Sequence, residues 1–116
     1  MPIRIERILL IQLRRLGGAL LAAALLDDLR RALPDASIDV LVGRHAAPVL
    51  AGHPLIRTRL VLEDRGTLAT ARLVRSERYD AVFDVQGSLR TAMITRASGA
   101  PLRVGWRVRA APLAYT

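Results

Sequence analysis

Short apolar runs alternate along this chain with segments of helical periodicity, and this alternation constrains the fold more than any other feature. The runs are Ile8–Leu13, Ile38–Val42, Leu60–Leu62, Ala81–Val85 and Leu102–Trp106. The first two are nearly continuous, as expected for strands that are buried on both faces of a parallel sheet. Alternating strands and helices therefore predict an α/β, Rossmann-like parallel sheet of about five strands with helices on both faces.

Three of the intervening segments have the apolar spacing of helices. In the first, leucines recur every four residues until Pro34 and Asp35 end the helix; they are Leu21, Leu25, Leu29 and Leu33. The second helix is expected over Thr67–Ser76. The segment His45–Ala51 is short and punctuated by prolines, so it gives a weak helix signal.

The third helix is expected from Ser88 to Ala97, with Leu89, Met93 and Ala97 on one stripe and Ser88 as the N-cap. Right-handed crossovers and the Rossmann pattern then predict the strand order 3-2-1-4-5, with Ile8–Leu13 at the centre. The chain ends soon after the fifth run, which suggests one half of a larger protein.

Composition limits the chemistry that the chain can perform. Its 116 residues suit a single domain spanning 1–116, and a 52% hydrophobic content excludes intrinsic disorder. There is no cysteine, which excludes disulfide scaffolds, thiolate metal sites and cysteine nucleophiles. The histidines, His45 and His53, are too few for an all-histidine metal site and are expected to be surface or packing residues. We expect no metal and no other cofactor.

The net charge of +8 comes entirely from arginine, because the chain has no lysine. The absence of lysine and asparagine fits a GC-rich genome, which weakens any inference from charge to nucleic acid. An aromatic content of 3% also argues against base stacking, so no nucleic-acid partner is expected. Arginine does favour planar anions such as phosphate and carboxylate.

Targeting signals are weak. The uncharged run Leu16–Leu26 is about half the length that a membrane-spanning helix needs. Arg14 and Arg15 before an apolar run superficially resemble a twin-arginine signal. The residues before them are apolar and the run ends in charged residues, unlike a signal peptide. We therefore expect a cytoplasmic domain.

Two glycine-containing loops follow predicted strands and are candidate binding loops. Ligands of open parallel sheets bind beyond the carboxyl ends of the strands, and glycine lets backbone N–H groups approach an anion. One loop is Arg14-Arg15-Leu16-Gly17-Gly18, and the other is Gln86-Gly87-Ser88. In both, the glycines could equally serve only to form a tight turn.

Side chains near these loops also have two interpretations. Asp84 ends the fourth run, where it could cap a backbone turn or hold a ligand hydroxyl, and the cap is favoured. Arg14, Arg15 and Arg90 could face an anionic ligand or simply be solvated charges. The sequence has no G-x-G-x-x-G or Walker A loop, no His-Glu-x-x-His motif and no Ser-His-Asp order.

Several segments in order resemble glycosyltransferase family 9, the lipopolysaccharide heptosyltransferases. Residues 7–22 resemble the family's opening strand, glycine loop and helix, and residues 29–42 its second element. Residues 78–91 resemble its Tyr-Asp…Asp-x-Gln-Gly…Arg-Ser/Thr signature through Tyr79, Asp84, Gln86, Gly87 and Arg90. Arg103-Val104-Gly105-Trp106 and the closing residues 113–116 also fit the expected order.

The resemblance implies a bacterial enzyme of GT-B architecture, in which two Rossmann-like domains face a cleft. This chain would be the N-terminal half, which binds an anionic sugar or glycolipid acceptor of the lipopolysaccharide inner core. The donor, ADP-heptose, would be bound by a C-terminal domain that this sequence lacks. Transfer would invert the anomeric centre without a bound metal, and peripheral contact with the cytoplasmic face of the inner membrane would be compatible with such an acceptor.

The resemblance further implies that Arg14, Arg15, Gly17, Asp84, Gln86, Gly87, Ser88 and Arg90 bind the acceptor. Gly18 occupies the position of the family's general-base aspartate, and glycine has no side chain to accept a proton. Either this copy is catalytically impaired, or another carboxylate replaces the base, or the residue was changed. The alternative function is a non-catalytic Rossmann-like binding or interaction module that has lost its chemistry.

Overall fold

The computed structural model describes residues 5–12, 16–44, 53–85 and 88–105. Five parallel strands form one sheet in the order β3-β2-β1-β4-β5. The strands are β1 (Arg7–Gln12), β2 (Ser37–Val42), β3 (Thr58–Val61), β4 (Ala81–Asp84) and β5 (Leu102–Gly105). The predicted α/β class, strand order and central first strand are therefore confirmed.

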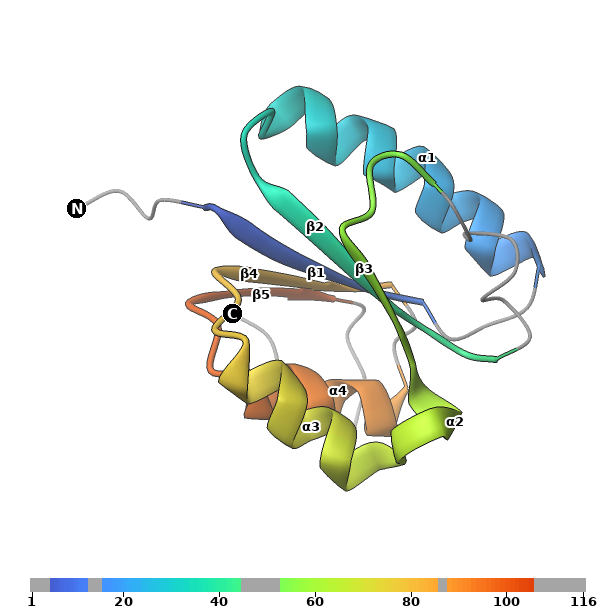
Figure 1. Cartoon of the computed structure of the whole chain (residues 1–116), viewed down its shortest axis with the longest axis vertical. Coiled ribbons are helices and arrows are strands. Elements are labelled where there is room, and N and C mark those ends of the chain that lie inside the picture. The colour runs from blue at the N-terminus through green and yellow to red at the C-terminus, as the bar shows by residue number, and fades with distance from the viewer. Residues whose placement is uncertain (1–4, 13–15, 45–52, 86–87, 106–116) are drawn as a thin grey trace.

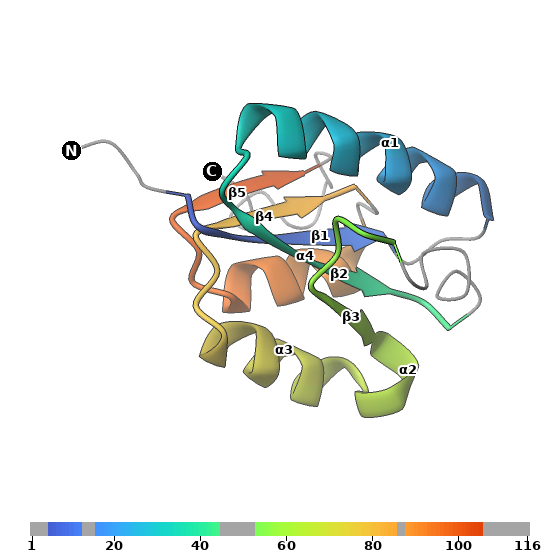
Figure 2. The same cartoon turned by 45° about the horizontal axis from the view of Figure 1, so that its top comes forward.

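Helices cover both faces of the sheet (Figure 1). Helix α1 (Leu16–Ala32) lies on one face, whereas α3 (Thr67–Ser76) and α4 (Leu89–Ala97) lie side by side on the other (Figure 2). This arrangement is the layered one that right-handed crossovers produce.

The sequence missed one short helix. Residues Leu60–Leu62 were expected to form the third strand, but β3 ends at Val61 and Leu62 begins helix α2 (Leu62–Arg65). The side chain of Leu62 is buried in the core although it lies in a helix. An apolar run alone therefore does not distinguish a strand from the start of a helix. Gly66, with φ of +81°, then separates α2 from α3.

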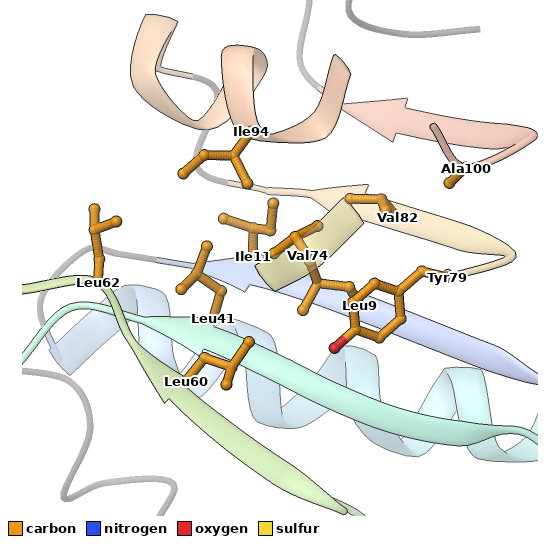
Figure 3. Packing of buried hydrophobic residues seen from close by; sticks show 10 residues of the cluster. All are labelled: Leu9, Ile11, Leu41, Leu60, Leu62, Val74, Tyr79, Val82, Ile94 and Ala100. Carbon is orange, nitrogen blue, oxygen red and sulfur yellow. The ribbon is translucent and has the colours of Figure 1, made fainter. Parts of the chain in front are cut away.

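Each face of the sheet carries its own core cluster. On the α1 face, Ile8, Leu10, Ile38, Val40 and Val42 pack against Leu26, which is fully buried. The predicted leucines at 25, 29 and 33 pack against this cluster and are only half-buried. The cluster on the α3–α4 face is shown in Figure 3 and comprises Leu9, Ile11, Leu41, Leu60, Leu62, Val74, Tyr79, Val82, Ile94 and Ala100.

The apolar stripe predicted for α4 does not face the core. Leu89 and Met93 are 52% and 58% exposed. The buried residues of this helix are Thr91, Ala92, Ile94 and Thr95. Spacing of four residues identifies one helix face but does not say whether the protein interior covers it.

Candidate functional site

The carboxyl edge of the sheet contains the point where the strand order reverses. Helix α1 follows β1 on one face, whereas α4 follows the neighbouring β4 on the other. In open α/β sheets the crevice between two such strands is the usual ligand site. The helices that follow these strands both begin at this edge, and helix N-termini attract anions. The predicted binding residues that the structure describes gather around this edge.

Two buried polar residues occupy the ends of these strands. Asp84 ends β4 with no exposed surface, and Gln12 ends β1 with 3% exposed. Asp84 lies opposite Ile11 in the register, one residue before Gln12. Alternation along the strands directs Gln12 to the α1 face and Asp84 to the α4 face.

Sequence reasoning singled out Asp84 and missed Gln12. The signal available for Gln12 was a polar residue at the end of an otherwise apolar strand. Asp84 was singled out because it is a carboxylate that lies next to a glycine turn as well as a strand end.

Ser88 is the N-cap of α4, as expected. Its Oγ accepts a hydrogen bond from the Thr91 backbone N–H at 3.2 Å, and the Ser88 N–H donates to Thr91 Oγ1 at 3.1 Å. This reciprocal capping box satisfies two backbone donors and fixes where the helix starts. Arg90, in the first turn of α4, is exposed. The cap thus orients Arg90 at the carboxyl edge.

The glycine loop after β1 requires a correction. Gly17 and Gly18 were expected to form the turn before the helix, but α1 already begins at Leu16 and includes both glycines in its first turn. The backbone N–H groups of a helix's first turn have no intrahelical partner, so Gly17 and Gly18 offer N–H groups from within the helix rather than from a loop. Arg14, Arg15, Gln86 and Gly87 lie outside the described residues.

The opposite, amino edge of the sheet contains a dense polar network centred on Asp39. This carboxylate is 2% exposed and accepts hydrogen bonds from Arg57 at 3.0 and 2.6 Å and from the Tyr79 hydroxyl at 2.5 Å. Arg7 contacts the Tyr79 ring at 5.3 Å and forms an ion pair of 2.5 Å with Glu77. The network links residues of β1 and β2 to residues that lie just before β3 and β4.

Titration of this network follows from its contacts. Burial, together with the hydrogen bond to Asp39, raises the pKa of Tyr79 well above its ordinary value, so the hydroxyl stays a donor. The hydrogen bond to Asp39 raises the pKa of Arg57. The hydrogen bond from Arg7 lowers the pKa of Glu77. The shifts of Arg57 and Glu77 both favour their charged forms, and the shift of Tyr79 favours its neutral hydroxyl.

The Tyr-Asp part of the sequence signature belongs to this amino edge. Asp80 Oδ2 accepts hydrogen bonds from the backbone N–H groups of Glu6 at 2.9 Å and Arg7 at 3.0 Å. Tyr79 and Asp80 thus lie at the opposite end of β4 from Asp84. Their contacts hold the sheet together, whereas the later part of the signature lies at the carboxyl edge.

Searches for two further features gave negative results within the described ranges. Among those residues, no group of three or more histidine, aspartate or glutamate side chains could hold a metal ion. In the same part of the chain, no helix is long and apolar enough to cross a membrane.

Comparison with known proteins shows which family the chain resembles. The model of glycosyltransferase family 9 (heptosyltransferase) matches residues 67–116. Lipopolysaccharide heptosyltransferase 1 of Campylobacter coli is 30% identical over 95 residues, which are 78% of this chain and 28% of that protein. The chain is a relative of the heptosyltransferases.

Solved structures of heptosyltransferases have the same fold. The E. coli ADP-heptose lipopolysaccharide heptosyltransferase II matches 94% of this chain and 33% of its own, with a TM-score of 0.82 and 25% identity. E. coli heptosyltransferase WaaC with ADP matches 95% of this chain and 40% of its own, with a TM-score of 0.76 and 22% identity. The heptosyltransferase relative described here thus spans about a third of the length of these proteins.

Proposed function

We propose that this chain is the N-terminal, acceptor-binding part of a heptosyltransferase that transfers heptose from ADP-heptose to the lipopolysaccharide inner core. The supporting observation is the similarity to heptosyltransferase II over 94% of this chain. The carboxyl edge adds the N-termini of α1 and α4 and the exposed Arg90, which are groups that bind anions. A donor-binding domain of GT-B type would supply the ADP-heptose site. The proposed location is the cytoplasm, with peripheral contact at the inner membrane.

The proposed acceptor site follows from the carboxyl edge. Phosphate or carboxylate groups of the acceptor would meet the N-termini of α1 and α4 and the guanidinium of Arg90. Asp84 would hold the loop or an acceptor hydroxyl. The whole proposed set is Arg14, Arg15, Gly17, Asp84, Gln86, Gly87, Ser88 and Arg90.

The chain alone is expected to transfer no sugar, for two independent reasons. Holding donor and acceptor in one cleft can supply roughly 7–11 kcal/mol of barrier lowering, and that requires a donor domain. A general base is typically worth about 10²–10⁴-fold, and Gly18 offers no group to accept the hydroxyl proton. Loss of the base slows a complete enzyme, whereas loss of the donor domain abolishes turnover.

The test is a pair of fusions to the donor domain of a similar heptosyltransferase, one with Gly18 and one with Gly18→Asp. We expect heptose transfer only, or at least about 10²-fold more, from the aspartate fusion. Equal activity from both fusions would show that position 18 is not the base. Chemical-shift mapping of the chain with a Kdo-containing acceptor provides the binding readout. We expect shifts at Asp84, Ser88 and Arg90, and shifts confined to residues 45–54 would contradict the site.

The second candidate function is a non-catalytic binding module, and Gly18 is the observation that favours it. Such a module would bind the acceptor yet stay inactive in both fusions. Binding with restored transfer in the Gly18→Asp fusion would instead favour the first candidate.

A further inference from the structure

The outer surface of the α3–α4 layer exposes large apolar side chains. Leu68 on α3 is 65% exposed, and Leu89 and Met93 on α4 are 52% and 58% exposed. The core-facing residues of the helices, such as Val74 and Ile94, lie on their opposite sides. The exposed apolar groups therefore point away from the sheet, in the layer seen below it in Figure 1.

Arginines accompany these apolar side chains at helical spacing. On α3, Leu68 is followed by Arg72 and Arg75 at i+4 and i+7, and on α4, Leu89 is followed by Met93 and Arg96 at the same intervals. All three arginines are exposed. Neither helix contains an acidic residue. We call the outer surface formed by Leu68, Arg72, Arg75, Leu89, Met93 and Arg96 the α3–α4 face.

Helix α1 provides the contrast on the other side of the sheet. Its described outer surface carries Asp27 and Asp28 beside Arg31, all exposed, so positive and negative charges are mixed there. The positive charge of the α3–α4 face is thus a local feature of one layer. A mixed-charge surface is typical of a face that meets only water.

A hollow between the C-terminal ends of α3 and α4 adds to the positive charge. It has a volume of about 740 Å³, and its charged lining residues are Arg72, Arg75, Arg78 and Asp80, so cations outnumber the single carboxylate. Arg75 also donates to the Ala97 carbonyl at 3.4 Å, which accounts for part of its position. The hollow is large enough for a phosphate group, and guanidinium groups are well suited to bind one.

We propose that the α3–α4 face lies against an anionic lipid bilayer. Leucine and methionine side chains would enter the boundary between headgroups and acyl chains, while the arginines contact lipid phosphates. The two helices lie in one layer, so their outer residues can meet a flat surface together.

Two other occupants suit the surface less well. A second copy of the chain would bring arginines against arginines, with no carboxylate on either helix to pair with them. A nucleic acid would be attracted by the charge, but the exposed leucine and methionine side chains would gain nothing from it. Neither helix offers an aromatic ring for base stacking.

The biological purpose of this membrane contact rests on the proposed function. Helix α4 begins at the carboxyl edge, so a bilayer under the α3–α4 face would be close to the proposed acceptor site. The two proposals can fail separately. Vesicle binding tests the face, whereas binding of a Kdo-containing oligosaccharide without its lipid tests the site.

The first experiment measures co-sedimentation of the chain with vesicles of equal parts phosphatidylglycerol and phosphatidylcholine. We expect binding to these vesicles, weakening with salt, and little binding to phosphatidylcholine alone. The double variant Arg72→Gln/Arg96→Gln should bind at least about tenfold more weakly. Arg31→Gln on α1 removes one charge and is the matched control for Arg72→Gln alone; it should bind like the parent chain, whereas Arg72→Gln should bind more weakly. Absence of binding, or equal binding to both vesicle types, would overturn the proposal.

The second experiment tests insertion at a single position. Because the chain has no cysteine, Met93→Cys can carry one polarity-sensitive fluorophore, and Asp28→Cys on α1 gives the control. Both positions are exposed, so both labelled chains are expected to fold. A blue shift on anionic vesicles is expected at position 93 and not at position 28. Equal shifts at both positions, or a shift at position 93 that follows protein concentration without vesicles, would overturn the proposal.

Discussion

The two edges of the sheet use polar residues in opposite ways. At the amino edge, Asp39, Arg57 and Tyr79 bind one another, and Asp39 is almost completely buried. At the carboxyl edge, Arg90 is exposed next to the capped start of α4. Charge density alone therefore does not locate a binding site in this protein. The densest polar cluster is a structural element, and the proposed binding edge is the one where helices begin.

The largest expected effect is a difference in the free energy of unfolding between substitutions at the two edges. Asp39→Ala leaves the Tyr79 hydroxyl and the Arg57 guanidinium without their shared acceptor, so we expect a loss of about 3 kcal/mol in the free energy of unfolding. The matched control is Asp64→Ala at the carboxyl edge, where Asp64 and Arg44 form an exposed ion pair of 2.9 Å. That loss should stay below about 1 kcal/mol. Urea denaturation measures both losses. Equal losses would contradict the structural role of the amino-edge network.

A binding measurement should give the reverse pattern. Arg90→Gln removes one guanidinium from the proposed acceptor site, and we expect acceptor affinity to fall on the order of tenfold while stability stays the same. Arg31→Gln on α1 should change neither quantity, because Arg31 lies in the other helical layer. Isothermal titration with a Kdo-containing oligosaccharide measures the affinity. An unchanged affinity in Arg90→Gln would remove this residue from the site.

The smallest expected effect depends on pH and belongs to the amino edge. The hydrogen bond from Arg7 lowers the pKa of Glu77 below its ordinary value of 4.5. A lowered pKa in the folded state adds stability that is present above the ordinary value and is lost as pH falls through the folded value. The Tm difference between the parent chain and Glu77→Gln should therefore shrink between neutral pH and about pH 3. A difference that stays constant would mean that Glu77 ionisation contributes nothing.

The sequence predicted the sheet because local patterns and handedness determine it together. Apolar runs located the five strands, and the preference for right-handed crossovers ordered them. The capping role of Ser88 was also predictable, since it depends on residues only three apart. The amino-edge network was not, because Tyr79 and Asp39 are forty positions apart and meet only in the folded chain.

The α4 stripe shows a different limit. The spacing of Leu89 and Met93 is the same for a helix face that packs inside the protein and for one that binds something outside. Thr91 and Thr95 are buried, so the side of α4 that carries Leu89 and Met93 faces outward. A pattern of apolar residues does not predict buried threonines. The position of Gln12 at the end of an apolar strand was visible in the sequence, but its burial depends on neighbouring strands.

The contact between Asp80 and the start of β1 has a consequence for variation within the protein. Asp80 binds two backbone N–H groups, of Glu6 and Arg7, so the contact does not depend on which side chains stand at those positions. It fixes the alignment of β1 with β4, and a slip of one residue would turn each strand's side chains to the wrong face. Because Asp84 lies four residues further along the same strand, the alignment set at one end also determines what the other end presents. A substitution at position 6 therefore leaves the backbone contact with Asp80 in place, whereas a change at Asp80 would be transmitted along the length of the strand.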